Sequence, residues 1–88
     1  MGTITTVYYI GGGAILFYIN APHAGMPTCA NNGANTRWAI NAATMGGQAQ
    51  LSGLMTAVAR GKRISIQGTG TCSVWGDTES VDYFVVED

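Results

Sequence analysis

Two cysteines, Cys29 and Cys72, lie 43 positions apart in this 88-residue chain and limit its fold more than any other feature. Together with the single histidine, His23, they supply too few ligands for a tetrahedral zinc site, and no CxxC spacing occurs. A catalytic Cys29–His23 pair is the alternative, but a disulfide is the favoured interpretation. In the chain-entropy model, closing a loop of this length stabilises a small domain by about 4 kcal/mol. A disulfide in turn predicts an oxidising compartment.

The composition describes an ordered single domain, residues 1–88, with an unusually uncharged surface. Hydrophobic residues make up 47% of the sequence and charged residues only 10%, whereas about 25% charged is usual. Small polar residues replace the missing charges, which suits a secreted protein or one that hides surface in a homo-oligomer. The sequence shows no signal peptide and starts directly in a β-rich run, which fits either a complete cytosolic protein or a mature secreted domain. The expected disulfide favours a mature secreted or periplasmic protein.

Charge and hydropathy also bear on possible partners. The net charge of −1 offers no broad basic field for nucleic acid, and the one cationic cluster, Arg60, Lys62 and Arg63, flanks an expected helix end. No segment reaches the roughly 18 apolar residues that cross a bilayer. We therefore expect neither a nucleic-acid partner nor membrane insertion.

The first half of the chain is predicted to form strands. β-Branched and aromatic residues predict strands over residues 3–10 and 14–20, joined as a hairpin by glycines 11–13. Strict alternation in the first strand places Ile4, Thr6 and Tyr8 on one face and Thr5, Val7 and Tyr9 on the other. A Pro-, Gly- and Asn-rich loop over residues 21–36 then leads to a short strand, "RWAIN", at residues 37–41.

A helix is predicted at about residues 45–60. Its apolar stripe has helical spacing and consists of Leu51, Leu54, Met55 and Val58. Thr44 is placed to cap its N-terminus, and Gly61 to end it in left-handed geometry. The opposite face, Gln48, Ser52 and Thr56, is small and uncharged, so another helix can approach it closely. Such a face suits a contact between helices.

Two strands are expected after the helix, over residues 62–70 and 81–88, with a turn at Gly76-Asp77 between them. The whole is a mostly β chain of five mainly antiparallel strands, with one helix between strands three and four and a Cys29–Cys72 disulfide. The simplest closed arrangement is a small OB-like barrel. The alternative is an open α+β sheet packed by one helix.

The candidate chemistry is that of binding rather than catalysis. The acids all lie in the last twelve residues, and "GTGTC" lacks the Lys and the following helix of a phosphate loop. No nucleophile motif occurs, so we predict a non-enzymatic module with no cofactor and no metal. Sugar sites combine aromatic rings with short polar groups, and the expected ligand-binding residues are Trp75, Asp77, Tyr9, Tyr18 and Asn32.

The stretch "WAINAATMGGQAQLSGLMTAVARGKRISIQGTGTC" resembles the OB-fold B subunits of AB5-type bacterial toxins, in the subtilase-cytotoxin and typhoid-toxin branch. The chain as a whole resembles small secreted bacterial proteins of uncharacterised function that end in "GTGTC…W…E.V.Y". The toxin resemblance implies a homopentamer that binds host glycans and partners a secreted catalytic A subunit. It also implies that the helices surround a central pore, which Gln48, Ser52 and Thr56 would face as the oligomer contact. The family's sugar-contacting motif matches no residue here. The competing hypothesis is a secreted structural or protein-interaction domain without a sugar ligand.

Overall fold

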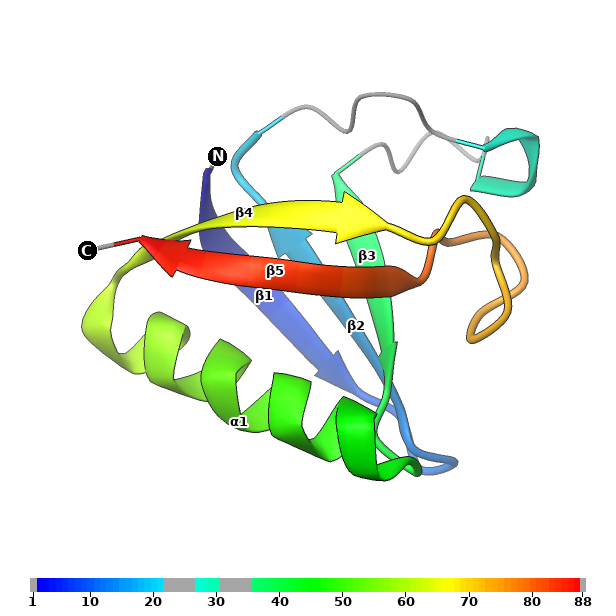
Figure 1. The fold of residues 1–88 in the computed structure, drawn as a ribbon, viewed down its shortest axis with the longest axis horizontal. Coiled ribbons are helices and arrows are strands. Elements are labelled where there is room, and N and C mark those ends of the chain that lie inside the picture. The colour runs from blue at the N-terminus through cyan, green and yellow to red at the C-terminus, as the bar shows by residue number, and fades with distance from the viewer. Residues whose placement is uncertain (1, 22–26, 31–35, 88) are drawn as a thin grey trace.

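The computed structural model describes residues 2–21, 27–30 and 36–87. Five strands, one α-helix and a short 3-10 helix make up this part of the chain (Figure 1). In chain order they are β1 (Gly2–Tyr9), β2 (Ala14–Ile19), η1 (Thr28–Ala30), β3 (Arg37–Asn41), α1 (Met45–Arg60), β4 (Arg63–Gly68) and β5 (Val81–Glu87). The predicted order of strands and helix is therefore confirmed.

The strands form one antiparallel sheet in the order β3-β2-β1-β4-β5. β1 pairs along its length with β2 but meets β4 at only two register pairs, Gly2 with Ile64 and Thr3 with Arg63. The β4–β5 hairpin therefore crosses the β1–β2–β3 layer, and α1 lies beside both layers (Figure 1). In the described residues β3 and β5 approach through a single parallel bridge, Ala39 with Ser80, so the sheet is not closed. The closed barrel that we expected is not present in this form.

A β-bulge changes which residues of β1 face the core. The pairing with β2 shifts between Ile4 and Thr6, so Thr5 is an extra residue without a partner in the register. Such a bulge reverses the alternation beyond it. Ile4 and Val7 therefore both pack against the core, whereas simple alternation placed them on opposite faces. That prediction was wrong because the period of two does not survive an inserted residue.

The core lies between the two layers and α1. Phe17 and Ile64 are completely buried, and the Trp38 side chain is 5% exposed. The buried cluster consists of Ile15, Phe17, Ile19, Trp38, Ile40, Leu54, Ala57, Ile64 and Val81. Every strand except β1 contributes at least one member of this cluster, and β2 contributes three of them.

The helix begins and ends as predicted, and three residues of its predicted apolar stripe, Leu51, Leu54 and Met55, pack in or against the core. The Thr44 hydroxyl accepts a hydrogen bond from the Gly47 N–H at 2.9 Å, and Gly61 adopts a φ of 64° after the last turn. Val58, which was expected in the buried stripe, is 42% exposed, and Ala57 is buried instead. Gly47 is buried together with Leu54 and Ala57, and it lies so close to the Asn41 carbonyl that no Cβ would fit there.

Candidate ligand-binding site

An aromatic pocket of about 230 Å³ lies on the face of the β1–β2–β3 layer that is turned away from the core. Its lining residues come from the ends of three strands and from the β4–β5 loop. They are Tyr8, Ile10, Leu16, Tyr18, Arg37 and Trp75. The cross-strand register explains the grouping, because Tyr8 pairs with Leu16 and Tyr18 pairs with Arg37.

Aromatic rings form the walls of this pocket. The Tyr8 and Tyr18 ring centroids lie 6.0 Å apart at an interplanar angle of 49°, within the range of favourable ring pairs. Tyr8 is 50% exposed and Trp75 is 37% exposed, whereas Leu16 beneath them is buried. The pocket therefore has an apolar floor and accessible ring faces.

Arg37 brings a fixed cationic group to the pocket. Its Nε donates to the Thr78 hydroxyl and its Nη2 donates to Asp77 Oδ1, both at 2.8 Å. The Thr78 hydroxyl donates in turn to Asp77 Oδ1 at 3.2 Å. The Arg37 side chain is only 16% exposed, so this ion pair is partly shielded from water. Asp77 balances the charge and holds one edge of the guanidinium, and the pocket is close to neutral.

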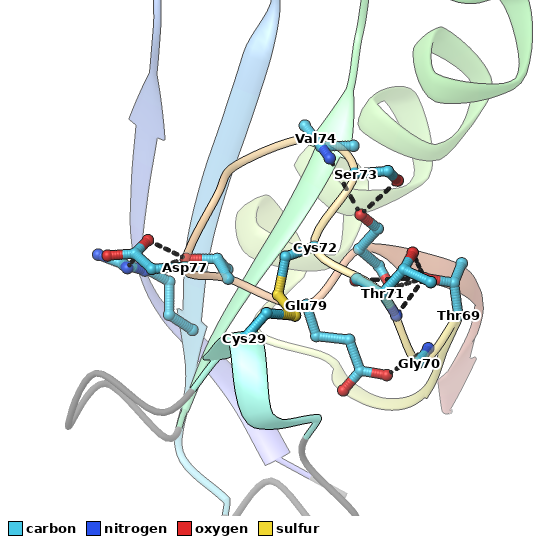
Figure 2. The surroundings of a disulfide bond; sticks show 12 residues. Cys29, Thr69, Gly70, Thr71, Cys72, Ser73, Val74, Asp77 and Glu79 are labelled. Carbon is cyan, nitrogen blue, oxygen red and sulfur yellow. Dashed lines mark hydrogen bonds and ion pairs between the residues drawn. A yellow bond between two sulfur atoms is a disulfide. The ribbon is translucent and has the colours of Figure 1, made fainter.

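The β4–β5 loop that carries Trp75 is tied down at several points. The Cys29–Cys72 disulfide joins it to η1, with Cα atoms 6.2 Å apart (Figure 2). The buried Glu79 carboxylate accepts a hydrogen bond from the Gly70 N–H at 2.8 Å. Gly70 has a φ of 81°, a left-handed conformation that glycine adopts without strain. Each tie reduces the freedom of the loop before a ligand arrives.

Backbone contacts fasten the same loop internally and to β3. The Ala39 N–H donates to the Glu79 carbonyl at 3.1 Å, and the Thr78 N–H donates to the Trp75 carbonyl at 3.0 Å. The second bond closes the predicted Gly76-Asp77 turn beneath Trp75. Inside the loop, the Ser80 hydroxyl accepts from the Val74 N–H and bonds to the Ser73 hydroxyl (Figure 2). Trp75 is thus presented by a loop whose polar groups are engaged with one another.

Three of the five predicted ligand-binding residues come together here. Tyr18 and Trp75 line the pocket, and Asp77 positions Arg37 at its side. Tyr9 does not take part, because it faces the helix side and its hydroxyl donates to Met55 Sδ at 2.8 Å. Asn32 lies outside the described residues. Asp77 and Glu79 do not form a carboxylate pair, because their side chains turn toward different partners (Figure 2).

Tyr8 and Arg37 were not predicted as site residues. Tyr8 was placed by alternation on the face opposite Tyr9, and pairing the hairpin around glycines 11–13 would have set it beside Leu16. Arg37 offered no such signal, since its partners Asp77 and Thr78 lie about forty residues away in sequence.

A second, polar hollow of about 330 Å³ lies between the N-terminus of α1 and the β4–β5 loop. Hydroxyl groups line it, but these groups already form hydrogen bonds within the protein. Thr44 caps the helix, Ser73 and Ser80 bond to each other, and Thr69 bonds to Thr71. The aromatic pocket is the better candidate site because its ring faces remain accessible.

The predicted helix face has the expected exposure. Gln48, Ser52 and Thr56 all lie on the solvent side of α1, and the Thr56 hydroxyl donates to the Ser52 carbonyl at 3.1 Å. Whether these side chains line a pore depends on other subunits and stays a prediction.

Across residues 2–21, 27–30 and 36–87 no three His, Cys, Asp or Glu side chains come close enough together to hold a metal ion. Both cysteines are consumed by the disulfide. Among the same residues, no helix has the length and apolar character to cross a membrane. No family model, curated protein or solved structure matches the chain.

Proposed function

We propose that this chain is a non-enzymatic, secreted binding module that holds one sugar unit in the aromatic pocket. The observation that carries the proposal is the grouping of Tyr8, Tyr18 and Trp75 beside an Arg37 whose charge is matched by Asp77. Aromatic faces pack against the C–H face of a sugar ring, while a fixed N–H donor bonds its hydroxyls. A volume of about 230 Å³ favours one ring rather than a longer segment.

The topology supports an OB-type assignment for the fold. β1 pairs with both β2 and β4, the helix separates β3 from β4, and β3 meets β5 in parallel at Ala39 and Ser80. OB folds are partly open five-stranded barrels that bind oligosaccharides or oligonucleotides on strands 2–3 and on the loops β1–β2 and β4–β5. Tyr18, Arg37 and Trp75 occupy the corresponding places.

Charge favours a sugar over a nucleic acid among the ligands of such a face. Single-stranded nucleic acid needs a basic groove that follows the phosphates. Here the pocket cation is already paired with Asp77, and Arg60, Lys62 and Arg63 belong to the end of α1 and the start of β4. The alternative of a structural or protein-interaction domain without a sugar ligand is separated from our proposal by experiment.

The disulfide indicates an oxidising, extracellular or periplasmic environment, which supports secretion. The toxin resemblance adds host glycans as ligands, a pentameric ring with its helices around a pore, and a secreted catalytic A subunit. They remain predictions, and the mass of the assembly in solution tests the ring.

A glycan array probed with labelled protein tests the proposal. We expect binding to a defined set of glycans that share a terminal sugar, and loss of this binding in Tyr8→Ala and Trp75→Ala variants. Removal of one stacking ring should weaken binding about tenfold, which equals about 1.4 kcal/mol. An array without any bound glycan contradicts the proposal and favours the protein-interaction alternative.

Tyr9→Ala is the matched control. Tyr9 is the next residue in the same strand and is 62% exposed, but it lies on the opposite face from the pocket. Equal loss of binding in the Tyr8→Ala and Tyr9→Ala variants would show that the sugar is not held where we place it.

A further inference from the structure

The side chains of the aromatic pocket offer more hydrogen-bond donors than acceptors. Their polar groups are the hydroxyls of Tyr8 and Tyr18, the indole N–H of Trp75 and the guanidinium of Arg37. Guanidinium and indole groups only donate, so the two tyrosine hydroxyl oxygens are the side-chain acceptors of the described lining. This lining contains no carboxylate, no amide side chain and no serine or threonine hydroxyl, in contrast to the polar hollow beside the start of α1.

Arg37 keeps one donor nitrogen for a ligand. Its Nε and Nη2 atoms bond to Thr78 and Asp77, and its side chain has no further interaction with the described residues. The Nη1 atom therefore carries two N–H groups without a partner in this part of the chain. Asp77 already matches the positive charge, and a ligand carboxylate would add a second negative charge beside it. An uncharged oxygen acceptor therefore suits Nη1 best.

The floor of the pocket is apolar. Leu16 is buried, and Ile10, which also lines the pocket, is half-buried. A sugar hydroxyl placed against these side chains would lose its hydration without gaining an acceptor for its proton. A methyl group in the same place would gain from burial instead.

Strand register brings the apolar floor and the donor together. Arg37 pairs with Tyr18, which lies two residues from Leu16 on the same face of β2. Leu16 and Arg37 are therefore diagonal neighbours across two strands. A single substituent of a sugar ring is able to contact both side chains.

An acetamido group has the two properties that this arrangement favours. Its carbonyl oxygen accepts hydrogen bonds and has no proton that needs an acceptor, and its methyl group is apolar. Its N–H is one donor, for which the tyrosine hydroxyl oxygens are acceptors. A hydroxyl at the same ring carbon has no methyl group, and its oxygen carries a proton.

We propose that the aromatic pocket selects a neutral N-acetylated sugar. The acetamido methyl group packs on Leu16 and Ile10, its carbonyl oxygen accepts a hydrogen bond from Arg37 Nη1, and the sugar ring lies against the aromatic side chains. This inference rests on the proposed function, because it names the class of sugar that the same pocket holds.

Two matched pairs of methyl glycosides test the inference: N-acetylglucosamine against glucose, and N-acetylgalactosamine against galactose. The members of each pair differ only in the acetamido or hydroxyl group at one ring carbon. Each sugar is titrated to about 50 mM into the disulfide-bonded protein, and the shift of the Trp75 indole N–H signal gives its dissociation constant. We expect at least one N-acetylated sugar to bind at least about tenfold more tightly than its hydroxyl counterpart.

The ratio of affinities within a pair shows where the acetamido group lies. Ile10→Thr keeps a β-branched side chain but places a hydroxyl at the floor, and Arg37→Met removes the donor. Each variant should reduce the ratio at least about threefold. Tyr8→Ala is the matched control, since loss of a ring should weaken both members of a pair and leave their ratio unchanged.

Equal affinities within both pairs would overturn the inference and leave the sugar site itself in place. A preference that survives in both Ile10→Thr and Arg37→Met would also overturn it, because the acetamido group would then lie elsewhere. If none of the four sugars binds, the inference fails as well, and the glycan array shows whether the proposed function fails with it.

Discussion

The two edge strands of the sheet, β3 and β5, differ in what covers them. The β3 edge is covered by the β4–β5 loop, which bonds to Ala39 and is held by the disulfide and by Glu79. On β5, the side chains of Tyr83, Val85 and Val86 are exposed. Polar contacts within the chain secure the first edge, whereas exposed apolar side chains mark the second.

This difference bears on the sugar site that we propose. A sugar site needs rings held in place before the ligand arrives, and the covered edge provides a loop with few free polar groups. The predictions below therefore aim at the covered edge, where stability and ligand binding should change together.

Removal of the disulfide should have the largest effect. Replacing both Cys29 and Cys72 by Ser opens a loop whose ends are 43 residues apart and should lower the free energy of unfolding by about 4 kcal/mol. Urea denaturation measures the loss. A change below about 1 kcal/mol would mean that the hydrogen bonds of the loop secure this edge without the disulfide.

Gly68 should be the next most sensitive position. A Cβ there would collide with the Glu79 carboxylate and lie 2.8 Å from Cζ3 of Trp38. We expect Gly68→Ala to destabilise the protein by about 1–3 kcal/mol through overpacking. Gly12→Ala, where nothing lies within 4 Å, is the control and should change stability by less than about 0.5 kcal/mol. Similar thermal unfolding of the two variants would contradict the close packing of Glu79 against β4.

The Arg37–Asp77 pair should give the smallest effect on stability. A double-mutant cycle with Arg37→Met and Asp77→Ala should yield a coupling energy of about 0.5–1 kcal/mol, because Asp77 is half exposed. The same variants should weaken sugar binding by more than the lost stability alone explains. No coupling in the cycle would mean that Asp77 does not hold the guanidinium in solution.

Local signals in the sequence predicted local structure correctly. The Thr44 cap, the Gly61 helix end, the glycine hairpin and the Gly76-Asp77 turn each depend on a few neighbouring residues, and each is present. The pairing of Cys29 with Cys72 also followed, since no other cysteine was available.

The missed features depend on contacts that are distant in sequence. The Thr5 bulge is set by the pairing of β1 with β2, and the burial of Ala57 rather than Val58 depends on how α1 packs against the sheet. Of the five aromatic and charged residues at the candidate site, Tyr18, Trp75 and Asp77 were predicted. Tyr8 and Arg37 reach the site through contacts that are distant in sequence. Strand register sets Tyr8 beside Leu16 and Arg37 beside Tyr18, and the ion pair with Asp77 holds Arg37 there.

The two tryptophans allow the most direct test of the sugar pocket. Trp38 is buried in the core and Trp75 lines the pocket, so the protein should give two separate indole N–H signals in an NMR spectrum. Addition of a sugar that the array identifies should shift the Trp75 signal in a saturable way and leave the Trp38 signal in place. Saturable binding that leaves the Trp75 signal unchanged would contradict the account.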